Sequence, residues 1–196
     1  SKNGRIHYST NTLGAVTGRA TASRPNVQQV PSERAEYGKE CRELFYAPKG
    51  WELMGSDQSG IELRALAHYM SEWDGGAYGK VILNGDIHTA NQKAAGLKSR
   101  AQAKSFIYSW LYGAGSAKIG SIVGLGAVAG TTLKRQFLEG LPALKNLQDM
   151  VQAQAKKGNV MGLDKRVIPV RHQHASLNTL LQSCGAILAK RWVVIF

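Results

Sequence analysis

The sequence predicts an α+β fold, on two observations. Apolar residues recur at helical spacing in three segments: 60–70, 130–157 with a break at Pro142, and 172–194. Alternation or turn residues mark three extended segments: 5–22, 51–57 and 160–171. With 196 residues, 43% of them hydrophobic, the chain is long enough to bury a substantial core.

The charge is strongly positive and unevenly distributed. Lys and Arg number 25 against 13 Asp and Glu, a net charge of +12. From Ile87 to Leu138 there is no acidic residue, while seven basic residues occur. This pattern predicts a polyanionic partner, nucleic acid or nucleotide phosphate, and leaves a merely basic protein as the alternative.

The two cysteines, Cys41 and Cys184, are too few for a disulfide framework or a metal cluster, so we expect both to be packing residues in a reducing compartment. No apolar run approaches 18 residues, and the N-terminus does not resemble a signal peptide. We therefore expect a cytoplasmic protein without a membrane partner. The apolar run at residues 192–196 has no helix cap, and the chain is expected to continue beyond it.

The segment SRAQAKSFIYSWLYGAG, from Ser99 to Gly115, predicts a helix with a chemically distinctive face. Arg100, Lys104, Tyr108 and Tyr112 recur every fourth residue, so one face carries two cations and then two phenols. A triphosphate with a flat base would suit this face. An ordinary amphipathic helix with solvated basic side chains remains the alternative.

The same helix has clear predicted ends. Ser99 and Gln102 fit a capping box, and Gly113 follows the last helical residues. Arg100 places a cation at the positive end of the helix dipole, which is unfavourable unless an anion is bound there.

Two aspartates precede predicted helices. Asp57 ends the strand-like run 51–57 and is a candidate catalytic or metal-binding carboxylate, with a helix cap as the alternative. Asp86 is predicted to cap a helix that has His88 near its start. His88 is placed either to meet a phosphate or to pack.

Four motifs, in this order, resemble DNA polymerase family A, the DNA polymerase I family, and its phage replicative branch in particular. They are TGR at residues 17–19 with PNVQQVP at 25–31, DQSGIELR at 57–64, the Arg100 to Gly113 helix pattern, and NTLLQSCGA at 178–186. The resemblance extends from about Gly4 to Phe196. It implies a DNA-directed DNA polymerase that adds dNTPs to a primer 3′ end.

The resemblance also implies an architecture. We expect an antiparallel palm sheet with helices, and a helical fingers subdomain, truncated at both ends. Residues 1–70 would form the first part of the palm, 71–158 the fingers and 159–196 a return to the palm. The family's final His-Asp-Glu motif is absent, so the isolated chain is expected to be inactive.

Family members bind two catalytic metal ions, expected to be Mg²⁺. The resemblance assigns one of the carboxylate ligands to Asp57 and a backbone ligand to the carbonyl of Gln58; the second carboxylate would lie in the missing motif. It assigns catalytic and triphosphate-binding roles to Arg100 and Lys104, with His88 nearby.

Contacts to the remaining parts of the substrates follow from the same resemblance. Tyr108 would stack on the base or sugar of the nucleotide, and Glu62 with Tyr112 would crowd the 2′ position of the sugar. Arg19 and Gln182 would donate hydrogen bonds in the DNA minor groove. The further candidates for primer or template contact are Asn26, Gln29, His174 and Asn178.

The expected partners are primer-template DNA and dNTPs, with a processivity factor left open. Two alternatives stay open: a non-catalytic DNA-binding module, and a palm and fingers like those of single-subunit RNA polymerases. Glu62 and the segment around Gln182 favour the DNA enzymes over the second.

Overall fold

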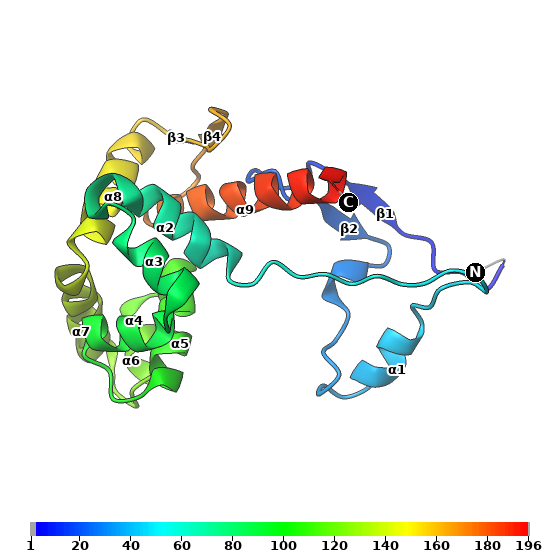
Figure 1. Ribbon diagram of the computed structural model, residues 1–196, viewed down its shortest axis with the longest axis horizontal. Coiled ribbons are helices and arrows are strands. Elements are labelled where there is room, and N and C mark those ends of the chain that lie inside the picture. Colours follow the sequence, from blue (N-terminus) through cyan, green and yellow to red (C-terminus); the bar gives the residue numbers. More distant parts are fainter. Residues whose placement is uncertain (1–2, 196) are drawn as a thin grey trace. The chain divides into compact units, whose positions relative to one another are not determined.

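The structure is a computed structural model that describes residues 3–195 (Figure 1). The chain divides into two compact units, Ser1–Ser59 and Gly60–Phe196. The described strands form two separate two-stranded sheets, so the mixed helix and strand content of the predicted α+β class is confirmed.

The first unit is mostly irregular chain around one hairpin. Strand β1 (Ser9–Asn11) pairs antiparallel with β2 (Thr21–Ser23), as the weak alternation predicts. A 3₁₀ turn, η1 (Val27–Gln29), follows, and helix α1 (Gly38–Glu43) is a single short helix. The Asn26 side chain accepts a hydrogen bond from the backbone N–H of Gln28 and so caps η1.

The predicted strand over residues 51–57 is wrong. These residues have no regular secondary structure, because a strand needs a hydrogen-bonded neighbour and none of the described strands pairs with them. Trp51, Leu53 and Met54 are 76%, 72% and 76% exposed. Asp57 therefore ends an irregular segment. It is also not the cap of the helix that follows, because the N-cap residue of that helix is Gly60, in the left-handed region at φ 61°.

The second unit is helical, with one hairpin. Its elements are α2 (Ile61–Asp74), α3 (Ala77–Asn84), α4 (Ile87–Ala95), α5 (Arg100–Leu111), α6 (Ser116–Ser121), α7 (Ala127–Gly140), α8 (Pro142–Ala155), β3 (Asn159–Met161), β4 (Val167–Pro169), η2 (Gln173–Ala175) and α9 (Ser176–Ile195). The predicted break at Pro142 is confirmed, because Pro142 is the first residue of α8, where a missing backbone N–H costs nothing. The extended segment predicted over 160–171 falls in a hairpin, in which β3 and β4 pair antiparallel with Lys165 in the turn.

One continuous apolar core holds this unit together. Helix α2 packs against α3, α8 and α9, while α4 packs against α5 and α7 (Figure 1). Phe106 of α5 and Phe137 of α7 are fully buried, with ring centroids 5.0 Å apart in an edge-to-face arrangement. Trp110 meets Phe137 in the same way at 5.5 Å. These contacts fix the inner side of α5.

Helices α6 and α7 approach closely because of two glycines. A Cβ on Gly130 would lie 1.9 Å from the carbonyl oxygen of Ser116, and one on Gly120 would lie 2.0 Å from that of Gly126. Only a residue without a side chain fits at either position. The ammonium of Lys134 on α7 donates a hydrogen bond to the carbonyl oxygen of Ala114, which follows the end of α5.

Both cysteines are free, and Cys184 is buried in the core, as expected of a packing residue. Within residues 3–195, no helix is both long and apolar enough to cross a membrane.

Candidate nucleotide-binding site

Helix α5 presents its predicted polar face because its other face is buried. Ala103, Phe106 and Ile107 have no exposed surface. Arg100 and Lys104 are exposed on the opposite side, Tyr108 is half-buried, and Tyr112 is the exposed residue that ends the helix. The predicted succession of two cations and two phenols along one face is therefore present.

The two ends of α5 match the prediction in part. The hydroxyl of Ser99 accepts a hydrogen bond from the backbone N–H of Gln102, and Gly113 takes the left-handed conformation at φ 75° after the last turn. The reciprocal half of the capping box is not formed. The Oε1 atom of Gln102 is buried and has no hydrogen-bond partner among the described residues.

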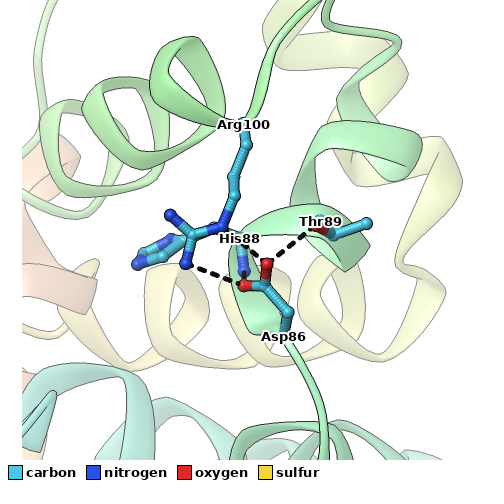
Figure 2. A network of polar contacts seen from close by, with 4 residues as sticks. All are labelled: Asp86, His88, Thr89 and Arg100. Carbon is cyan, nitrogen blue, oxygen red and sulfur yellow. Dashed lines mark hydrogen bonds and ion pairs between the residues drawn. The ribbon is translucent and has the colours of Figure 1, made fainter.

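The N-cap residue of α4, Asp86, forms an ion pair with Arg100, the first residue of α5 (Figure 2). The Arg100 Nε donates to Oδ2 at 2.6 Å, and Nη2 donates to Oδ1 at 3.2 Å. Asp86 also caps α4, as predicted, since it accepts from the backbone N–H of His88 at 3.0 Å and from the Thr89 hydroxyl at 2.8 Å. The anion beside Arg100 in this structure is thus the protein's own carboxylate.

These hydrogen bonds set the charge states of both partners. The bonds from Arg100 and Thr89 hold the pKa of Asp86 well below its ordinary value, and the pKa of Arg100 is raised in return. Both side chains remain charged across the working range of pH.

His88 lies in the first turn of α4 and is half-buried. Burial lowers its pKa, and the positive charges of Arg100 and Lys104 lower it further, against an opposing effect of Asp86. Its Nδ1 atom has no hydrogen-bond partner among the described residues. The ring centroid lies 6.2 Å from that of Tyr108, so α4 and α5 place His88 beside the polar face of α5.

A second cluster joins three helices at the other end of α5. The Tyr112 hydroxyl donates to Oε1 of Glu62 at 3.2 Å, and the Gln182 amide donates to the same oxygen at 3.4 Å. Glu62 belongs to the first turn of α2 and Gln182 to the buried side of α9. Residues separated by 50 and 120 positions in the chain are therefore brought together.

The remaining predicted residues lie elsewhere on the second unit or in the first unit. Asn178 is half-buried on α9, and His174 is exposed in η2 with its ring stacked on His172 at 5.6 Å. The other five lie in the first unit, Gln58 half-buried and the rest exposed: Arg19, Asn26, Gln29, Asp57 and Gln58.

The described residues hold no group of three or more His, Cys, Asp or Glu side chains that could bind a metal ion. Asp57 and the Gln58 carbonyl are oxygen donors of the kind that Mg²⁺ prefers. These two oxygen atoms therefore fit as part of the set of ligands that a Mg²⁺ ion needs.

The family model for DNA polymerase family A matches residues 1–195. The chain belongs to DNA polymerase family A. The resemblance carried by the four sequence motifs is confirmed.

Two relatives are the DNA-directed DNA polymerases of Enterobacteria phage T3 and Escherichia phage T7, each 46% identical over 99% of this chain. A bacterial family member, the DNA polymerase I of Aquifex aeolicus, is 29% identical over 100% of the chain. The chain spans 31% of the length of the two phage polymerases.

The fold is also that of a family member. The polymerase domain of Pol1 from M. smegmatis, solved in complex with DNA primer-template and dNTP, superposes with a TM-score of 0.77. At 22% identity the match covers 97% of this chain and 37% of that one. This similarity supports the palm and fingers class of fold.

The ion pair between Asp86 and Arg100 was not predicted from the sequence. Asp86 was predicted as a cap and Arg100 as an anion-binding residue, each on its own helix. The charge pattern held a signal, because Asp86 is the last acidic residue before the acid-free stretch that begins at Ile87.

Proposed function

We propose that this chain forms the nucleotide-binding part of a DNA-directed DNA polymerase that extends a primer with dNTPs, in phage DNA replication in the host cytoplasm. The polar face of α5 is the observation that carries the proposal. It offers two cations at its N-terminal end and two phenols at its C-terminal end, in the order in which a nucleotide offers phosphates, sugar and base. Relatives that are DNA-directed DNA polymerases support this reading.

The cations act on the phosphates. Phosphoryl transfer spreads negative charge over the phosphate oxygens and requires positioned cations to stabilise it. Lys104 is exposed one turn beyond Arg100, and neutral His88 can donate a hydrogen bond beside them. Arg100 and Lys104 therefore place the triphosphate and stabilise its charge in the transition state.

The phenols act on the sugar and base. Tyr108 presents its ring between Lys104 and Tyr112, where it stacks on the nucleotide beside the sugar. Glu62, held by Tyr112 and Gln182, occupies the space that a 2′-hydroxyl would need. A deoxyribose fits, and a ribose clashes.

Further polar residues are proposed to contact the DNA. Arg19 and Gln182 donate to acceptors that every base pair presents in the minor groove, so binding is independent of sequence. Asn26, Gln29, His174 and Asn178 add primer or template contacts. The net charge of +12 supports a polyanionic partner. We assign residues 1–70 and 159–196 to the palm and 71–158 to the fingers.

Asp57 and the Gln58 carbonyl are proposed to hold Mg²⁺ together with a carboxylate from outside the described residues. When bound, the metal ions activate the primer 3′-oxygen and neutralise phosphate charge. The described residues contribute the positioning of the nucleotide.

Primer extension tests the proposal. A complete family A polymerase carrying this sequence should extend a primer opposite all four template bases, and Asp57→Asn should abolish extension while primed DNA is still bound. The 196-residue chain alone should bind primed DNA with an affinity that falls with salt, and should not extend it. Binding without extension by the complete polymerase would instead support the DNA-binding module.

A further inference from the structure

Asp86 connects two helix starts that both face the proposed triphosphate site. Its carboxylate caps α4 through the backbone N–H of His88 and grips Arg100, the first residue of α5. The carboxylate of Asp86 therefore accepts hydrogen bonds from both the His88 backbone and the Arg100 side chain (Figure 2).

The pair leaves part of the guanidinium available. Asp86 occupies the edge formed by Nε and Nη2, and no hydrogen bond reaches Nη1 within residues 3–195. Figure 2 shows the second terminal nitrogen of Arg100 pointing away from the carboxylate. A guanidinium donates along more than one edge, so a phosphate can bind the outer edge while Asp86 keeps the inner one.

The pair is exposed, so its main effect is not on stability. The Arg100 and Asp86 side chains are 56% and 41% exposed, and such pairs contribute little to the free energy of unfolding. What a two-point hydrogen bond does achieve at such a site is to restrict a long side chain to one orientation.

We propose that Asp86 is a positioning residue, which holds Arg100 so that its outer edge faces the triphosphate of the nucleotide. This inference rests on the proposed function. Asp86 acts through Arg100 and does not itself contact the phosphates. The carboxylate and the phosphates then bind different edges of one guanidinium rather than competing for it.

Two opposing effects of Asp86 can be compared. Its negative charge repels a triphosphate, which between screened, exposed charges changes the affinity by only about a few-fold. Ordering a free arginine side chain costs up to about 30-fold in affinity. Orientation is therefore the larger effect, and removing the carboxylate should weaken triphosphate binding although it makes the site more positive.

Calorimetry on the 196-residue chain tests this with Mg²⁺·dATP and with inorganic tripolyphosphate as probes. Asp86→Asn keeps a good helix cap but weakens the grip on Arg100. We expect its Kd to rise about five- to tenfold for both probes. The matched control is Asp149→Asn, the same charge change at an exposed pair with Lys145 on α8, which should stay within about twofold.

A double-mutant cycle separates positioning from a general structural effect. In an Arg100→Met background, Asp86→Asn should no longer weaken binding, because there is no guanidinium to orient. Asp86→Ser, which also caps a helix, should reproduce the effect of Asp86→Asn if the latter variant proves unstable. Circular dichroism would establish that each variant is folded.

The outcomes distinguish the inference from the function on which it rests. Suppose first that Arg100→Met weakens binding but neither Asp86→Asn nor Asp86→Ser does. The positioning role is then wrong and the proposed function stands. The same conclusion follows if the Asp86 variants raise the Kd by the same factor in the Arg100→Met background as in the wild type. If the wild-type chain binds neither probe, or if neither Arg100→Met nor Lys104→Met weakens binding, both are wrong.

Discussion

The Tyr112 hydroxyl donates a 3.2 Å hydrogen bond to Oε1 of Glu62 and so joins the end of α5 to the first turn of α2. Gln182 of α9 donates to the same oxygen. The carboxylate is thereby held in one place by two donors from different helices. A rigid group at this point can exclude a substituent on the nucleotide by steric contact.

Glu62→Ala should therefore weaken discrimination against ribonucleotides. In a complete family A polymerase carrying this sequence, we expect the ratio of kcat/KM for a deoxynucleotide to that for its ribonucleotide to fall by about tenfold or more. Glu72→Ala, in the last turns of the same helix, is the control and should leave the ratio unchanged. An unaltered ratio in Glu62→Ala would show that Glu62 does not face the sugar.

Tyr108→Phe should restore discrimination against dideoxynucleotides. The phenol lies one turn beyond Lys104, and in the proposed site it is beside the 3′ carbon of the sugar, where its hydroxyl would replace a missing 3′-hydroxyl. Phenylalanine keeps the stacking surface but removes that hydroxyl. The ratio of kcat/KM for dTTP to that for ddTTP should rise by at least about tenfold, with normal incorporation nearly unchanged. No rise would mean that Tyr108 is not at the sugar.

His88 should make the second unit less stable at acidic pH. Burial, Arg100 and Lys104 keep its pKa below the ordinary 6.5, so the folded chain binds this proton less readily than the unfolded chain does. Its contribution to stability is complete above about pH 6.5 and is lost as the pH falls toward the lower folded pKa. In urea titrations, the free energy of unfolding of His88→Gln should fall less between pH 7 and pH 5 than that of the wild type. An equal fall in both proteins would contradict the lowered pKa of His88.

Phe137→Ala should destabilise the helical unit strongly. The ring is fully buried between Phe106 and Trp110, so truncation leaves a cavity behind α5. We expect a loss of about 3 to 5 kcal/mol in the free energy of unfolding, measured by urea titration. Val128→Ala, at a side chain that is 85% exposed, should change it by less than about 0.5 kcal/mol. Equal effects of the two variants would refute the packing.

Local features were predictable where the residues themselves determine them. Ser99 and Asp86 cap their helices because their side chains accept backbone N–H bonds a few positions away, and Pro142 starts α8 because it lacks an N–H. The apolar spacing likewise identified the buried side of α2, where Leu63, Leu66 and Met70 lie in the core.

Features that depend on distant segments were not predictable in this way. The run 51–57 has strand-like residues but no described strand beside it, so it stays irregular. The capping box was predicted from the spacing of Ser99 and Gln102, but the spacing does not ensure the hydrogen bond from the Ser99 backbone N–H to the Gln102 side chain, and that bond is not formed. The pairing of Asp86 with Arg100 requires α4 and α5 to pack together, which neither helix encodes alone.

The proposed binding of the triphosphate by the polar face of α5 can be tested with Lys104→Met. In primer extension by a complete family A polymerase carrying this sequence, Lys104→Met should lower kcat/KM for dNTPs by about 100-fold or more. Lys118→Met, which removes the same charge from an exposed position on α6, should stay within about threefold. Equal kcat/KM values for Lys104→Met and the wild type would contradict the placement of the triphosphate on this face.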